Sequence, residues 1–438
     1  MKQESNRMKD QPPRVVITGM SINTPIGDDL DTFYRNLIAG RSAITRWKFF
    51  ENKDVLSKVG GDLSDYDFDA KVQGLKDKLP DEMFQRFRRL VKKAPFSTRF
   101  SLICAVDAWL DAGLDSSGDL ERRGVLVGGH NLNEKYLIDN HLVFLEEPEY
   151  IDSLMALLYL DTDHATSVSE VLGWMGPAYT LGGACASGNV ALRNAFDEIR
   201  HHDCEMMMVV GPVLQFSAMG VQSMALMGAI SFTRFNDRPA EASRPFDADR
   251  EGFIPAHGAG AIVLENLDHA LRRNARIHAE LLGVAAMADA CHLPNPSMEG
   301  QARTILRLLR QTGVPPEKID FVSGHATSTP LGDISELMAI KKVFGDHARK
   351  LKINAPKSML GHTCWSAPLV ETVASVMQLK HKKLHPSINI ENLDPDVDLD
   401  VCANRAVDHE AHYILKNSFG FGGISCCSLI KRFDENEL

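Results

Sequence analysis

The sequence lacks the features that define several large classes of protein. Its 438 residues contain no apolar run of the roughly 18 residues that a membrane span requires. The start, MKQESNRMKDQPPR, is polar and lacks the apolar core of a secretory signal. We therefore expect no membrane association, and residues 1–13 are predicted to be a disordered tail.

Zinc-binding and nucleic-acid-binding signals are also missing. The eight cysteines form no CxxC pair, and no Cys/His cluster has zinc-finger spacing. Scattered cysteines in a large chain suit a reducing compartment, so we expect a cytoplasmic protein without a metal site. The formal net charge of -10 argues against a general nucleic-acid binder, which would normally be basic.

What the chain does contain is an alternation of short apolar strands with amphipathic helices, which is typical of an α/β fold. Strands are predicted at 15–19, 124–128, 206–210, 260–265, 278–286, 321–323, 413–415 and 425–431, and helices at 29–39, 98–113, 301–312, 333–344 and 366–380. The alternation begins again after residue 270. Because the chain is too long for one small core, we predict two similar α/β halves, 14–270 and 271–438.

The segment YTLGGACASGN, residues 179–189, places Cys185 on a turn of small residues before a helix-compatible stretch. A thiol at a helix N-terminus meets the positive end of the helix dipole, which favours the reactive thiolate. Cys185 is thus a candidate nucleophile. A buried, inert cysteine is the usual fate of a free thiol, and this segment alone leaves both interpretations open.

Two histidines lie in loops rich in small residues. His325 follows a short strand in SGHATSTPLGD, and His362 ends NAPKSMLGH, five residues after Lys357. Histidine and lysine both serve as catalytic acids, bases or electrostatic groups. A lone histidine is more often structural, and the lysine could equally be a solvated loop residue.

A fourth segment, KNSFGFGG at 416–423, combines three glycines with two phenylalanines. Glycines such as Gly422 make the turn flexible, and Phe419 and Phe421 could act as aromatic gates. The alternative is a surface turn, but two exposed aromatic side chains would be unusual there.

Together these segments resemble the β-ketoacyl-acyl-carrier-protein synthases, particularly the elongating type II enzymes and the related polyketide ketosynthases. The resemblance runs from RVVITGM at 14–20 to NSFGFGG at 417–423 and includes RPFDADREGF at 244–253. It implies a thiolase-like fold with a layered α-β-α-β-α architecture, and a homodimer or a heterodimer with a related subunit. No cofactor and no metal would be needed, because the thioester carbonyl already activates the α-carbon.

The resemblance also implies how acyl transfer would proceed. Cys185 would attack an acyl thioester and hold the acyl group covalently. The backbone amides of Cys185 and Phe421 would form the oxyanion hole. Phe421 would gate the second substrate, supported by Phe419 and Gly422.

For carbon–carbon bond formation, the resemblance assigns the remaining residues. His325 and His362 would stabilise the enolate that forms when malonyl-carrier protein loses carbon dioxide. Lys357 would orient the site electrostatically, and Glu371, fourteen residues later, could pair with it.

Several positions depart from the family pattern. Ala326 follows the first histidine where the family has glycine, and Trp365 and Pro368 stand in a stretch that is usually small. His257 occupies a position where a carboxylate is expected. These departures favour a specialised polyketide-type ketosynthase over a housekeeping fatty-acid synthase.

The leading hypothesis is decarboxylative Claisen condensation in fatty acid or polyketide biosynthesis. One alternative is a malonyl-carrier-protein decarboxylase of a polyketide pathway, a group that often lacks the cysteine. Another is a partner subunit that sets chain length, which typically loses it. A thiolase is less favoured still: it would require a second catalytic cysteine in the C-terminal loop, and although Cys426 and Cys427 lie close, NSFGFGG resembles the ketosynthase signature.

The partner implied by the resemblance is an acyl carrier protein, which is acidic. An acidic enzyme then needs a local basic docking site. The segment FQRFRRLVKK at 84–93 supplies one, because Arg86, Arg89 and Lys93 share a face at helical spacing. A solvated helix face is the competing interpretation.

Overall fold

The computed structural model describes residues 12–291 and 295–437, so residues 1–11 of the predicted tail lie outside the described residues. Ten strands form one sheet in the order β10-β9-β13-β14-β8-β1-β7-β6-β4-β5. Their bounds are β1 (Val15–Asn23), β4 (Arg123–Gly128), β5 (Ala178–Leu181), β6 (Met206–Gly211), β7 (Ala259–Asn266), β8 (Ala279–Ala288), β9 (Phe321–Ser323), β10 (Lys352–Asn354), β13 (Tyr413–Gly420) and β14 (Ile424–Lys431). Two small ribbons pair β2 (Ile44–Arg46) with β3 (Val59–Gly61) and β11 (Lys383–Leu384) with β12 (Val407–Asp408).

The two halves of the large sheet have the same topology. Numbered along the chain within each half, the strands lie in the order third, second, fourth, fifth, first: β5-β4-β6-β7-β1 and β10-β9-β13-β14-β8. In both halves the second strand is parallel to its two neighbours, and the other pairings are antiparallel. The first strands, β1 and β8, pair with each other and join the halves. The prediction of two similar α/β halves is confirmed, whereas the division at residues 270–271 falls inside α11 (Leu267–Arg272) and stays a prediction.

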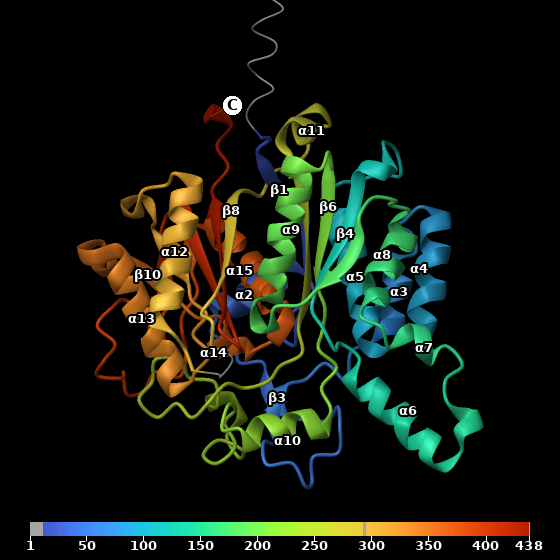
Figure 1. The fold of residues 1–438 in the computed structure, drawn as a ribbon, viewed down its shortest axis with the longest axis horizontal. Helices are drawn as coiled ribbons and strands as arrows, with labels where there is room; N and C mark the ends of the chain where they lie inside the picture. The colour runs from blue at the N-terminus through green and yellow to red at the C-terminus, as the bar shows by residue number, and fades with distance from the viewer. Residues whose placement is uncertain (1–11, 292–294, 438) are drawn as a thin grey trace, which may run out of the picture.

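Helices complete the layers on both sides of each half-sheet (Figure 1). The outer layers are α5 (Phe96–Asp111) with α8 (Thr162–Leu172), and α12 (Met298–Thr312) with α13 (Pro330–Phe344). Between the half-sheets lie α9 (Ser187–His201) and α15 (Ala367–His381), each in contact with strands of both halves. This arrangement is the layered α-β-α-β-α architecture that the family resemblance implied.

The remaining helices lie around this layered body. They are α2 (Leu30–Ile38), α3 (Phe68–Leu75), α4 (Asp81–Lys93), α6 (Glu134–Glu146), α7 (Met155–Leu158), α10 (Ala218–Leu226) and α14 (Lys357–Leu360). No helix among the described residues combines the length and the apolar character needed to cross a bilayer.

The central helices cross closely where the site will form. A Cβ on Gly188 would lie 3.0 Å from Cβ of Pro368, so glycine at this position lets α9 approach α15. Nearly every residue of α15 is buried, which explains its apolar and small side chains on all faces. The N-termini of the two helices, carrying Cys185 and Trp365, therefore lie close together.

Candidate active site

Cys185 lies in the 3-10 turn η3 (Ala184–Ala186), directly before α9. The preceding residue, Ala184, has φ 48°, an uncommon conformation for a non-glycine residue that bends the chain sharply between β5 and the helix. Gly420 at the end of β13 packs against this turn, since a Cβ there would lie 2.8 Å from the Gly183 carbonyl oxygen. The turn thus holds the thiol, 6% exposed, at a helix N-terminus as predicted.

Burial dominates the acidity of this thiol. It raises the pKa of Cys185 to about 11, while the charge of Lys357 and the backbone amides of Phe421 and Cys185 act to lower it. Burial therefore outweighs the stabilisation that we expected from the helix N-terminus, and the thiol is protonated at neutral pH. The same two amides are those that the resemblance assigned to the oxyanion hole, and both act on the sulfur.

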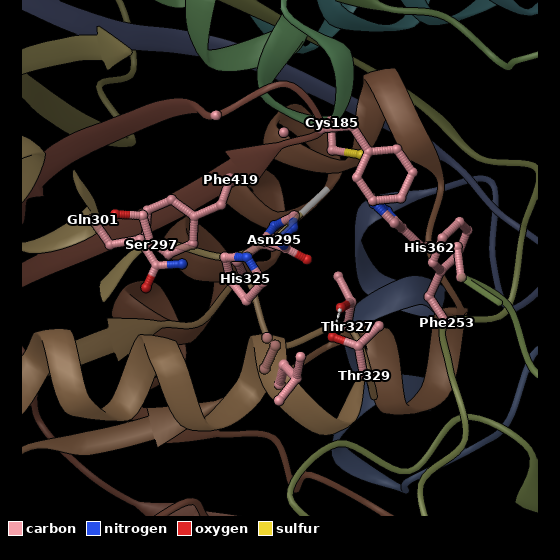
Figure 2. A pocket seen from close by; sticks show the side chains of 18 of the residues that line it. Cys185, Phe253, Asn295, Ser297, Gln301, His325, Thr327, Thr329, His362 and Phe419 are labelled. Atoms are coloured by element: carbon pink, nitrogen blue, oxygen red, sulfur yellow. Dashed lines mark hydrogen bonds between the residues drawn. The ribbon is translucent and has the colours of Figure 1, made fainter. Parts of the chain in front are cut away.

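A cavity of about 500 Å³ brings the predicted site residues together. Cys185, His325 and His362 all line it and converge on one space in Figure 2. Thr327 and Thr329, which are hydrogen-bonded to each other, line the cavity beyond His325. The C-terminal half thus supplies two histidines to a space that also contains the thiol of the N-terminal half.

His362 has a defined hydrogen-bonding state. The backbone N–H of Cys364 donates to its Nδ1 at 3.2 Å, so the ring proton is assigned to Nε2. That Nε2 is buried and has no hydrogen-bond partner among the described residues. A buried, unpaired N–H is costly, so this nitrogen is a donor available to an acceptor in the cavity.

Backbone hydrogen bonds fix the position of His325. Its N–H and that of Ala326 donate to the two carboxylate oxygens of Glu336 on α13, at 2.9 and 2.8 Å. Its Nδ1 is buried without a partner in the part of the chain that the structure describes. The rings of His325 and His362 lie edge to face with centroids 5.5 Å apart, and both residues line the cavity.

Both imidazoles are neutral. Burial is the main cause that holds the pKa of His325 and of His362 well below the usual range, and the charges of Lys357 and Lys416 add to it. The two rings are therefore available as neutral N–H donors rather than as cations.

Behind the histidines lies a buried ionic network. Lys357 forms an ion pair with Glu371, as the family resemblance suggested, and Lys416 pairs with the other carboxylate oxygen. No role was predicted for Lys416 or for Glu336. A signal was available in YILKNSF, because a lysine inside an apolar strand requires a buried anion.

The glycine-rich segment forms one wall of the cavity. Phe421 is 38% exposed, and its ring lies 6.2 Å from that of Phe253. Phe419 lies against His325 with centroids 5.7 Å apart. Gly422 has φ 82°, a left-handed conformation that favours glycine. These positions suit a gate, a role that stays a prediction for Phe419, Phe421 and Gly422.

The structure shows what surrounds the residues that depart from the family pattern. The ring of Trp365 stacks on His130 at 4.4 Å and does not line the cavity, whereas Ala326 lines it. His257 is fully buried among aromatic rings, with centroids 4.7 Å from Phe49 and 5.2 Å from Trp47.

The proposed docking residues are not part of this site. They lie on α4, on the outer flank of the N-terminal half (Figure 1). Arg86 is half-buried and donates to the Val171 carbonyl at 3.3 Å, and Arg89 pairs with Glu170. Lys93 is exposed. Arg86 therefore also supports the packing of α4 on α8, which its position in the sequence did not reveal.

Among the described residues, no three His, Cys, Asp or Glu side chains are grouped to hold a metal ion. The expectation that the chemistry needs neither metal nor cofactor stays a prediction.

The chain is similar in sequence and in overall structure to known proteins. The chain is 33% identical over 423 residues to 3-oxoacyl-[acyl-carrier-protein] synthase 2 of Coxiella burnetii, covering 96% of this chain and 98% of that protein. It is 30% identical to the polyketide biosynthesis malonyl-ACP decarboxylase PksF of Bacillus subtilis, covering 97% of both. A solved type II polyketide ketosynthase, in complex with its acyl-carrier protein and bound to a hexaketide, superposes with a TM-score of 0.85 at 28% identity, covering 97% of this chain and 100% of that one.

The family models extend the agreement along the chain. Residues 13–270 match the N-terminal domain of beta-ketoacyl synthases, and residues 278–391 match the C-terminal domain. The chain belongs to the beta-ketoacyl synthase family.

Proposed function

We propose that this chain is a β-ketoacyl-[acyl-carrier-protein] synthase, which condenses an acyl thioester with malonyl-carrier protein in fatty acid or polyketide biosynthesis. One observation carries the proposal. Cys185, with two amides acting on its sulfur, shares a cavity of about 500 Å³ with two neutral histidines whose buried ring nitrogens lack partners. Covalent acyl transfer needs the thiol and the two amides, and enolate formation needs the N–H donors of the histidines.

The first step loads the enzyme. The Cys185 sulfur attacks the acyl thioester carbonyl, and the amides of Cys185 and Phe421 stabilise the oxyanion. The carrier thiol leaves and takes up the proton that Cys185 gives up, so the step produces acyl-Cys185 and free carrier thiol. Because burial keeps the thiol protonated, its proton must be lost as the C–S bond forms.

The second step forms the carbon–carbon bond. Malonyl-carrier protein loses carbon dioxide, and the electron pair of the broken bond becomes an enolate whose oxygen accepts N–H donation from His325 and His362. The enolate carbon attacks acyl-Cys185. The Cys185 sulfur leaves and regains a proton, and the β-ketoacyl group stays on the carrier.

A carrier protein and a second copy of the chain complete the proposal. Arg89 and Lys93 are the exposed cations of the predicted docking site, with Arg86 half-buried beside them. For the homodimer, the support is that β5 ends the sheet order and that α6 buries none of its residues. Large apolar side chains are exposed on and after α6: Leu137, Leu142, Val143, Phe144, Leu145, Tyr150, Leu154, Leu157, Tyr159 and Leu160. An unpartnered apolar surface of this kind favours a protein interface, either with a second copy or with a related subunit.

We propose a cytoplasmic location for the protein as well. All eight cysteines are free thiols, which supports the expected cytoplasmic location.

A malonyl-carrier-protein decarboxylase is the second candidate, supported by the similarity to PksF over 97% of the chain. Such an enzyme needs the histidine donors but does not need an acylated cysteine. Cys185 and the amides around it are therefore what favour condensation.

Acylation of Cys185 tests the proposal. A labelled acyl thioester should modify Cys185 alone among the eight cysteines, and peptide mapping by mass spectrometry would locate the label. A label on another cysteine, with Cys185 unmodified, would contradict the assignment of the nucleophile.

A further inference from the structure

A pair of stacked rings lies beside the turn that carries the nucleophile. Trp365 belongs to the 3-10 turn η7 (Cys364–Ser366), which contacts the turn of Cys185 where the two central helices begin. Its indole stacks on the ring of His130, with centroids 4.4 Å and planes 27° apart. His130 in turn lies over Gly182, because a Cβ on that glycine would lie 3.2 Å from its Cδ2. The pair therefore borders the segment that leads into the nucleophile turn.

The position of Trp365 is fixed by its neighbours along the chain. Oγ of Ser366 donates to the Gly258 carbonyl at 2.6 Å, and the N–H of Cys364 donates to Nδ1 of His362 at 3.2 Å. The indole also packs against the apolar core of the N-terminal half and against a second apolar cluster beside that core. The backbone on both sides of Trp365 is thus held, and its ring is packed among other side chains.

The cavity reaches Cys185 from the opposite side. Apart from Cys185, every residue that lines the cavity lies at or after Met227 in the sequence, and neither His130 nor Trp365 is among them. Met227 and Leu331, which are 50% and 69% exposed, place the cavity mouth at the surface. A carrier-bound thioester therefore reaches the buried thiol through this cavity, and the arm that links it to the carrier occupies the cavity.

The acyl chain then has to find space elsewhere. The carbonyl carbon that Cys185 attacks bears the carrier arm on one side and the acyl chain on the other, so the chain points away from the cavity mouth. During condensation the malonyl thioester occupies the cavity beside His325 and His362. The acyl group on Cys185 is then confined to the far side of the thiol, where the stacked pair lies.

We propose that Trp365, held against His130, determines primer specificity by limiting the acyl group on Cys185 to a short chain such as acetyl. This inference rests on the proposed function. A closed apolar pocket discriminates by about 10–200-fold for a single methylene group, so an indole in the path of the chain should exclude medium-length primers. Trp365 stands in a stretch that is usually small in the family, so the restriction belongs to this side chain and not to the fold.

Loading of Cys185 from acetyl-, butyryl- and octanoyl-carrier protein tests the inference, with intact-protein mass spectrometry as the readout. In the wild type, octanoyl should load about 10²-fold more slowly than acetyl. Trp365→Ala should bring octanoyl within about tenfold of acetyl, and Trp365→Phe, which keeps a ring on His130, should retain the wild-type preference. Equal loading of acetyl and octanoyl by the wild type would overturn the inference, whether or not Trp365→Ala folds. So would an equal loss for all three primers in Trp365→Ala, because a merely structural role has that result.

A chemical adduct separates this inference from the proposed function. Octyl methanethiosulfonate attaches an octyl chain to Cys185 without acyl transfer: a disulfide forms, methanesulfinate leaves and the thiol proton goes to solvent. Crystal structures of the adducts should show the chain in the cavity beside His325 in the wild type, and in the space of the missing indole in Trp365→Ala. A wild-type chain that displaces Trp365 or His130, or a chain that stays in the cavity of Trp365→Ala, would overturn the inference. If no acyl thioester loads Cys185, the proposed function fails, and the adduct structures still decide the inference.

Discussion

The two halves of the molecule use the same backbone turn for different purposes. In each half a 3-10 turn that contains a positive φ, 48° at Ala184 and 53° at Cys364, leads directly into a buried central helix. The turn follows β5 in the first half, whereas in the second half α14 separates it from β10. The residue after the one with positive φ is Cys185 in the first half and Trp365 in the second. Trp365 packs on His130, and its turn contributes the Cys364 amide that orients His362. A repeated scaffold thus gives equivalent positions, and the side chains placed there decide which half carries the nucleophile.

The largest expected effect comes from removing the side chain that distinguishes the halves. Cys185→Ala should abolish acyl loading and condensation, because both need the sulfur. It should leave carbon dioxide release from malonyl-carrier protein, which does not. Cys185→Gln, which resembles the acylated state, should release carbon dioxide faster by opening the Phe421 gate. Intact-protein mass spectrometry and carbon dioxide release measure the two activities. Trp365→Ala should still load acyl groups on Cys185, and failure to load would break the proposed division between the halves.

The second prediction concerns the contribution of the C-terminal half. His325→Ala and His362→Ala should each slow carbon dioxide release by about 10²–10³, the usual effect of removing one oxyanion donor. Acyl loading of Cys185 should continue in both, since its oxyanion hole consists of backbone amides. Wild-type rates of carbon dioxide release in both variants would refute the histidine assignment.

A smaller effect is expected where the C-terminal half touches the nucleophile turn. A Cβ at Gly420 would lie 3.2 Å from the Cys185 amide nitrogen and 2.8 Å from the Gly183 carbonyl, so Gly420→Ala should displace that amide. We expect acyl loading to slow on the order of 10². Gly74→Ala, on α3 with open space around the added methyl group, is the control. Unchanged loading in Gly420→Ala would show that the turn tolerates the displacement.

The smallest effect is expected at the docking site on the N-terminal half. Arg89→Glu with Lys93→Glu should raise KM for carrier-bound substrate roughly tenfold, and added salt should have a similar effect on the wild type. Small thioester mimics should react at the wild-type rate. Arg349→Glu with Lys350→Glu, at exposed positions of the C-terminal half, matches the change in net charge. Equal losses for carrier-bound and small substrates would place the docking site elsewhere.

The sequence was sufficient to predict the alternation of strands and helices, and the family resemblance implied that Cys185, His325 and His362 share one site. The structure places all three along one cavity. The lysine within YILKNSF indicated a buried charge, but the sequence could not identify Glu371 as its partner, because that pairing depends on the position of α15 against β13. For the same reason, the local expectation of a thiolate at Cys185 omitted the burial that raises its pKa to about 11.

Helix packing explains the other incomplete predictions. Arg86 looked exposed at helical spacing, but α8, which the sequence analysis did not predict, covers it. The strand predicted at 413–415 continues to Gly420, because pairing with β14 orders the backbone up to the glycine-rich turn.

Product analysis tests the central claim most directly. Wild-type enzyme receives an acyl primer and malonyl-carrier protein labelled with ¹³C in the malonyl methylene, and the carrier-bound products are identified by mass spectrometry. The account predicts a labelled β-ketoacyl-carrier protein that depends on Cys185. Labelled acetyl-carrier protein as the sole product, with every primer tried, would contradict condensation and establish the decarboxylase alternative.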